Sequence, residues 1–137
     1  MKGARTFIDT NILVYAFTND EPDKQEIALH TLDNCLPVIS TQVLKELANV
    51  FLKKKNVSTQ VVLDTLNEIS YITEVVEESS DLIFRALVMH EKHGFSFYDS
   101  LIIETALAAN CVNLLSEDMQ DGQIISGTLK IKNPFKI

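Results

Sequence analysis

The sequence contains little cysteine, glycine or proline, and this scarcity limits its possible architecture. Its two cysteines, Cys35 and Cys111, lie far apart and form no CxxC pair. Two such cysteines do not make a disulfide framework, and they indicate reduced, buried thiols in an intracellular protein. The four glycines and three prolines form no low-complexity tract, repeat or linker. We therefore expect one domain covering residues 1–137, and its 46% hydrophobic content is enough for a core.

Positive charge is also scarce in this chain. Twelve Lys and Arg residues against 19 Asp and Glu residues give a net charge of −7. This balance alone argues against a nucleic-acid binder, because phosphate contacts usually come from a basic face. The argument weakens if several acids hold divalent cations, because the local sign of the charge then inverts. The one basic run, Lys53–Lys55, is interpreted as a solvated helix end.

Several functional motifs are absent. There is no Gly-rich phosphate loop and no dinucleotide-binding fingerprint. His90 and His93 are three residues apart, whereas the zinc-protease motif needs a spacing of four. The aromatic residues are scattered, so no base-stacking platform is predicted. The N-terminal apolar stretch is broken by Asp9 and Asn11, which predicts neither a signal peptide nor a membrane span, and a cytoplasmic location is expected.

Short apolar strands alternate with amphipathic helices along the chain. The expected strands cover residues 4–9, 37–40, 71–76 and 112–115, with a last edge strand at 130–132. The expected helices cover residues 11–18, 23–34, 41–55, 58–69, 79–92 and 98–110, the fifth ending at Gly94. This alternation predicts an α/β fold with a parallel sheet covered on both faces. Ligands in such sheets bind outside the carboxyl ends of the strands.

Two of the predicted strands end in carboxylates. Asp9 closes the apolar run that starts at Thr6, and the run 112–115 is followed by Ser116, Glu117 and Asp118. An ionised carboxylate near a core costs on the order of several kcal/mol unless something pairs with it. Asp9 also suits a helix N-cap, and a turn with an Asp cap is the alternative for Asp118. Only one of Glu117 and Asp118 needs to enter a site.

Two further acids fall on helices close to buried faces. Glu46 lies about 100° around its helix from the centre of the apolar stripe, so it flanks the buried face. Its alternative is a half-exposed side chain paired with Lys53 or Asn49. Asp99 lines up with the apolar stripe of its own helix, although its spacing from Ser96 also suits a capping box.

The four acids together point to a metal site. Carboxylates packed closely without partners repel one another and would hold protons. A hard divalent cation such as Mg²⁺ or Mn²⁺ resolves this conflict, because it takes oxygen ligands and usually binds a few carboxylates together with substrate phosphates. The pattern therefore predicts an acidic metal site at one edge of the sheet.

With these acids in place, the chain resembles the PIN-domain ribonucleases, and in particular the small VapC-type toxins of prokaryotic toxin–antitoxin pairs. The resemblance spans nearly the whole chain. It is carried by Phe7-Ile8-Asp9-Thr10-Asn11, by the segments 39–46, 97–102 and 115–122, and by Asn133-Pro134-Phe135.

The resemblance implies a three-layer α/β/α sandwich with a central, mainly parallel sheet, and an endoribonuclease that depends on Mg²⁺ or Mn²⁺. It implies that the catalytic and metal-binding acids are Asp9, Glu46, Asp99 and Asp118. Asn11 and Ser116 would support the site by hydrogen bonding, and Asp121 could replace or assist Asp118. Family members are commonly homodimers, and a partner antitoxin silences them by covering the active-site groove.

The resulting hypothesis is metal-assisted hydrolysis of an RNA phosphodiester, with no protein nucleophile. One alternative is a phosphatase of the haloacid dehalogenase type, in which Asp9 is the nucleophile. That class carries Asp-x-Asp at this point, whereas the second position here is Asn11. The other alternative is a protein-interaction module that keeps the fold but has no catalytic activity.

Overall fold

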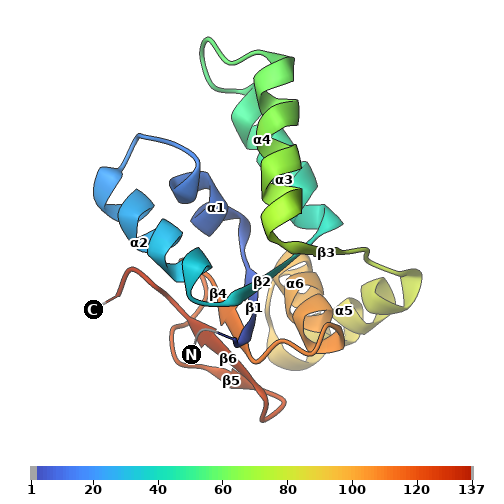
Figure 1. Ribbon diagram of the computed structural model, residues 1–137. Helices are drawn as coiled ribbons and strands as arrows, with labels where there is room; N and C mark the ends of the chain where they lie inside the picture. Colours follow the sequence, from blue (N-terminus) through green and yellow to red (C-terminus); the bar gives the residue numbers. More distant parts are fainter. Residues whose placement is uncertain (1–2, 137) are drawn as a thin grey trace.

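A computed structural model of the chain describes residues 3–136 (Figure 1). The strands are β1 (Arg5–Ile8), β2 (Leu36–Ser40), β3 (Glu74–Val76), β4 (Asn113–Leu115), β5 (Ile124–Ile125) and β6 (Leu129–Lys132). The helices are α1 (Thr10–Ala16), α2 (Pro22–Asp33), α3 (Thr41–Leu52), α4 (Thr59–Ile72), α5 (Ser80–His93) and α6 (Phe97–Ala108). None of the helices in this part of the chain combines the length and apolar character needed to cross a membrane.

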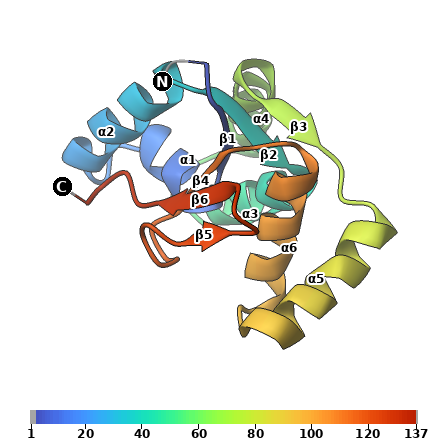
Figure 2. The same ribbon diagram turned by 90° about the horizontal axis from the view of Figure 1, so that it is seen from below.

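The strands form one sheet in the order β3-β2-β1-β4-β6-β5, and every neighbouring pair is parallel except β5 with β6. From β1 the chain steps outward to β2 and β3, then returns to place β4 on the other side of β1. Right-handed crossovers therefore put α1 to α4 on one face and α5 with α6 on the other. Figures 1 and 2 show these two helical layers on opposite sides of the sheet. The expected three-layer α/β/α sandwich is confirmed.

The central strands are apolar on both faces because helices cover both. Phe7 and Ile8 of β1 and Leu114 of β4 are completely buried, as is typical of a parallel sheet between helical layers. In β6 only alternate residues are buried, namely Leu129 and Ile131. One face of that strand is therefore open to solvent.

Two strand predictions were wrong in their details. The strand at 130–132 is not the edge, because β5 pairs with its outer side. A two-residue strand gives too little sequence pattern to be recognised. Strand β3 starts at Glu74 rather than at residue 71, because α4 continues through Tyr71 and Ile72. Tyr71 and Ile72 are exposed and extend the helix whose inner side buries Val62 and Ile69, so the β-favouring residues there did not start a strand.

Candidate active site

Asp9 and Ser116 stand side by side where two adjacent parallel strands end. Ile8 of β1 is in register with Leu115 of β4, and the next residue of each strand leaves the sheet. The connection from β1 leads to β2 on one side, whereas β4 lies on the other side. This is a reversal of strand order, the place where open α/β sheets bind ligands.

Asp9 is held by both of its carboxylate oxygens. Oδ1 accepts a hydrogen bond from the backbone N–H of Thr10 at 2.8 Å, and Oδ2 accepts one from Ser116 Oγ at 3.0 Å. Asp9 is also the N-cap of α1, so the capping alternative is correct as well. The pKa of Asp9 is raised to about 6, chiefly by burial; the charges of Glu46 and Asp99 also raise it, and the two hydrogen bonds oppose the rise. Among residues 3–136, no cationic side chain forms an ion pair with Asp9.

Glu46 reaches the same place from α3. Its Oε1 accepts hydrogen bonds from Thr10 Oγ1 at 3.0 Å and from Gln42 Nε2 at 3.3 Å. Glu46 is exposed, as the alternative expected, but it pairs with Thr10 and Gln42 rather than with Lys53 or Asn49. Thr10 directly follows Asp9, so one residue of α1 links the two acids.

Asp99 lies in the first turn of α6, where its N–H donates to the N-cap side chain of Ser96 at 3.1 Å. The pKa of Asp99 is raised, chiefly by burial and also by the charge of Asp118, while the hydrogen bond with Ser96 lowers it. Asp99 thus has a capping contact and also lies near another acid of the predicted set.

Asp118 is exposed and is positioned by two polar side chains. Asn11 Nδ2 donates to Asp118 Oδ2 at 3.0 Å, and the Asp118 N–H donates to Ser116 Oγ at 3.3 Å. Ser116 also accepts from the N–H of Met119 at 3.3 Å. This buried serine therefore connects Asp9 to the loop that carries Asp118, and the two residues predicted to give support, Asn11 and Ser116, each bond an acid.

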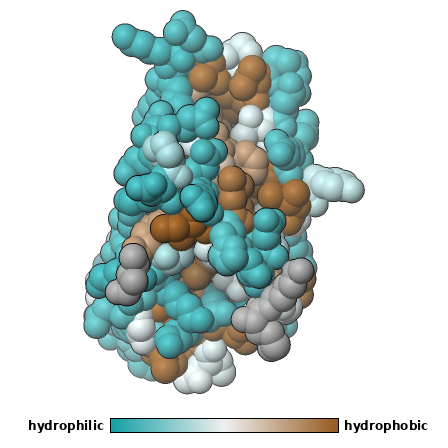
Figure 3. All heavy atoms as spheres, turned by 60° about the vertical axis from the view of Figure 1, so that its left-hand side comes forward, coloured by the Kyte–Doolittle hydropathy of each residue, from teal (hydrophilic) through white to brown (hydrophobic). Residues whose placement is uncertain are grey.

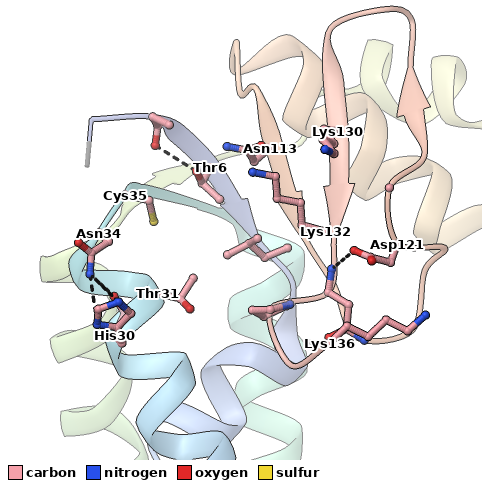
Figure 4. Close-up of a pocket in the computed structure, with 15 residues that line it drawn as sticks. Thr6, His30, Thr31, Asn34, Cys35, Asn113, Asp121, Lys130, Lys132 and Lys136 are labelled. Atoms are coloured by element: carbon pink, nitrogen blue, oxygen red, sulfur yellow. Dashed lines mark hydrogen bonds between the residues drawn. The ribbon is translucent and has the colours of Figure 1, made fainter. Parts of the chain in front are cut away.

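The two remaining acids of this loop make structural contacts. Glu117 accepts from Tyr15 and Lys24. Asp121 accepts from the backbone N–H of Asn133 at 2.8 Å (Figure 4). Asp121 lines a hollow of about 520 Å³ together with the lysines at positions 130, 132 and 136; Figure 4 shows these side chains around it. Asp118, whose charge acts on Asp99, is the better candidate for the fourth acid.

The donor set fits a hard divalent cation. None of the four candidate acids forms an ion pair within residues 3–136. In the same part of the chain, no three acidic, histidine or cysteine side chains are arranged to ligate one ion directly. Mg²⁺ usually keeps several waters and binds through one or two carboxylates together with substrate phosphates. The acids therefore suit a hydrated ion better than a closed protein cage.

Sequence reasoning missed the two residues that fix Glu46. Gln42 lies four residues before Glu46 on α3, and this helical spacing was a usable signal. The contact of Thr10 with Glu46 depends on how α1 packs against α3, and no local pattern reveals that packing.

We expect Ser116→Ala to destabilise the protein by about 2 kcal/mol. The substitution removes the hydroxyl donor to Asp9 and leaves two backbone N–H groups without their acceptor. Urea unfolding followed by circular dichroism measures the change. The exposed Ser80 at the start of α5 provides the control, since Ser80→Ala should have little effect. Equal stability of the two variants would contradict the connecting role of Ser116.

Comparison with known protein families matches residues 6–120 to the PIN domain. No curated protein matches the chain. Among solved structures, a toxin–antitoxin complex from Klebsiella pneumoniae has a TM-score of 0.74 at 20% identity, covering 96% of this chain and 99% of that one. VapBC2 from Rickettsia felis, bound to a DNA fragment from its promoter, has a TM-score of 0.67 at 22% identity, covering 94% of this chain and 99% of that one. The Mycobacterium tuberculosis toxin VapC20, described as cleaving the sarcin–ricin loop, has a TM-score of 0.63 at 17% identity, covering 80% of this chain and 86% of that one. At these identities the likeness concerns the fold.

Proposed function

Because this chain belongs to the PIN-domain family, we propose that it is an endoribonuclease that uses Mg²⁺ or Mn²⁺ and serves as the toxin of a toxin–antitoxin pair. One observation carries the proposal. Four carboxylates, from the end of β1, from α3, from α6 and from the loop after β4, approach one edge of the sheet, and none of them forms an ion pair within residues 3–136. Such an arrangement is costly unless a cation binds, so stability alone does not account for it.

The metal ligands we propose are Asp9, Glu46, Asp99 and Asp118. When bound, a divalent ion supplies an activated water and neutralises charge on the phosphate and the leaving oxygen. The protein contributes orientation, because Thr10 and Ser116 fix both oxygens of Asp9. Thr10 and Gln42 fix one oxygen of Glu46 in the same way. Above a pH of about 6, Asp9 is ionised and able to act as a ligand.

The partners we propose are an RNA substrate, a small antitoxin protein and a second copy of the chain. The similar structures from Klebsiella pneumoniae and Rickettsia felis support the antitoxin, since both are toxin–antitoxin assemblies. Exposed apolar side chains independently support a protein partner. Figure 3 shows apolar atoms gathered in a band on the side that carries α2, with polar atoms around it. Exposed apolar patches of this kind commonly mark protein interfaces.

The direct test is cleavage of RNA by the purified protein. We expect cleavage in Mg²⁺ or Mn²⁺ and none in EDTA. In Asp99→Asn we expect the cleavage rate to fall by more than about 100-fold, since mutation of a residue that only supports a metal ligand already lowers activity about 10–100-fold. Asp118→Asn should show a similar loss, while Asp121→Asn, its matched control three residues away, should remain active. Full activity in Asp99→Asn would refute the proposed mechanism. A trapped phosphoryl group on Asp9 would instead favour the phosphatase alternative.

A further inference from the structure

A second hollow, of about 510 Å³, is lined in part by Glu46. One wall is a single face of α3, formed by residues 42, 45, 46 and 49 at helical spacing. The opposite wall comes from α5 and the start of α6, with Ile83, Phe97 and Tyr98. A mainly apolar wall facing a few polar groups is the usual composition of a pocket for a small planar ligand.

The aromatic pair in this wall is well suited to stacking. The rings of Phe97 and Tyr98 meet edge to face, with centroids 5.2 Å apart. Phe97 packs into a small core with Leu82 and Leu101, which anchors it. Tyr98 is 63% exposed, so its ring is available to a ligand. Splayed RNA bases stack on exposed aromatic rings of this kind.

The polar groups of the hollow differ in whether they are open to a ligand. Gln42 donates through its amide nitrogen to Glu46, and its Oε1 is buried without a partner. Lys45 forms no ion pair within residues 3–136. Glu78, by contrast, is fully engaged, because its two oxygens accept from Thr41 Oγ1 and from the N–H of Gln42. Since both ends of the Gln42 amide are buried or bonded, the groups open to a ligand are the exposed amide of Asn49 and the exposed ammonium of Lys45.

The hollow adjoins the acidic site through two residues. Glu46 lines the hollow and also bonds Thr10, the neighbour of Asp9. Tyr98 directly precedes Asp99 on α6. A nucleotide whose phosphate lies at the acids therefore has this hollow as an adjacent site for its base.

We propose that this hollow binds a nucleobase next to the scissile phosphate of the RNA, an inference that rests on the proposed nuclease function. The base stacks on Tyr98 and presents its edge to the amide of Asn49, and Lys45 contacts a neighbouring phosphate. The hollow then contributes to the choice of cleavage site, since an amide forms different hydrogen bonds with different base edges.

Substitution of Tyr98 tests this assignment. For Tyr98→Ala we expect the KM for RNA cleavage to rise by at least about fivefold, because loss of a stacked base weakens binding by this amount or more. Tyr98→Phe keeps the ring and should raise the KM much less than Tyr98→Ala does. Tyr71→Ala is the matched control, since Tyr71 is 90% exposed on α4 and does not line the hollow.

A binding measurement separates stacking from catalysis. In an Asp99→Asn background, RNA carrying 2-aminopurine beside the mapped cleavage position should lose fluorescence on binding, and adding Tyr98→Ala should remove this quenching. Equal KM values and equal quenching in the alanine variants of Tyr98 and Tyr71 would overturn the nucleobase site while leaving the nuclease proposal intact. Failure of the wild type to cleave RNA in either metal would instead refute the nuclease itself.

Discussion

Asp9→Asn should make the metal-free protein more stable at pH 7 and leave it without nuclease activity. In the folded chain the pKa of Asp9 is about 6, because burial disfavours its charge, whereas its ordinary value is 3.8. This difference corresponds to a destabilisation of about 3 kcal/mol at pH 7. Asparagine keeps the shape and removes the charge. We therefore expect a gain of up to about 3 kcal/mol in urea unfolding with EDTA, and a loss of more than about 100-fold in RNA cleavage.

The pH dependence of this gain identifies its cause. A raised carboxyl pKa means that the folded chain binds a proton between about pH 6 and pH 4 that the unfolded chain does not bind. The wild type therefore recovers stability relative to Asp9→Asn as the pH falls from 7 to 4, and the difference between the two proteins shrinks over this interval. Asp64→Asn, on the exposed side of α4, should show no such trend. A constant difference would rule out the charge of Asp9 as the cause.

Mg²⁺ or Mn²⁺ should stabilise the wild type at pH 7.5 by about 2.7 kcal/mol when the free ion is at 100 times its dissociation constant. At pH 5 the same ion concentration should stabilise the protein much less, because the proton on Asp9 competes with the metal. Thermal unfolding across a metal titration at both pH values measures this effect without any substrate.

Two variants make the metal experiment specific. Asp9→Asn should show little stabilisation by metal at either pH, since it lacks the central carboxylate. Asp121→Asn should behave like the wild type, because Asp121 bonds the backbone of Asn133 rather than the other acids. Stabilisation of equal size in Asp9→Asn and the wild type would place the ion elsewhere on the surface.

The sequence was most informative where a local pattern and a buried environment agreed. Apolar runs located β1, β2 and β4, and capping residues such as Gly94, whose φ is +78°, located helix ends. Asp9 stood out because a carboxylate directly after a buried strand conflicts with burial. Its approach to Ser116 followed from the rule that parallel strands bring their carboxyl ends to one edge.

What the sequence could not predict depends on packing between distant elements. The bond from Thr10 to Glu46 joins α1 to α3, and no periodicity encodes that contact. The aromatic residues look scattered along the chain, yet Phe97 and Tyr98 at the start of α6 line one hollow together with the face of α3 that carries Glu46. The two-residue strand β5 was missed because its pairing with β6, rather than its own composition, makes it a strand.

The bond between Ser116 and Asp9 spans 107 residues, and this separation has a consequence for the protein during its synthesis. Chains are made from the N-terminus, so Asp9, Glu46 and Asp99 exist before β4 and its loop. Until residues 113–118 are available, β1 lacks one of its two neighbours and Asp9 lacks its hydroxyl donor. A partly synthesised chain that ends before residue 118 therefore cannot have the complete site, and the activity we propose cannot begin before that residue has been made.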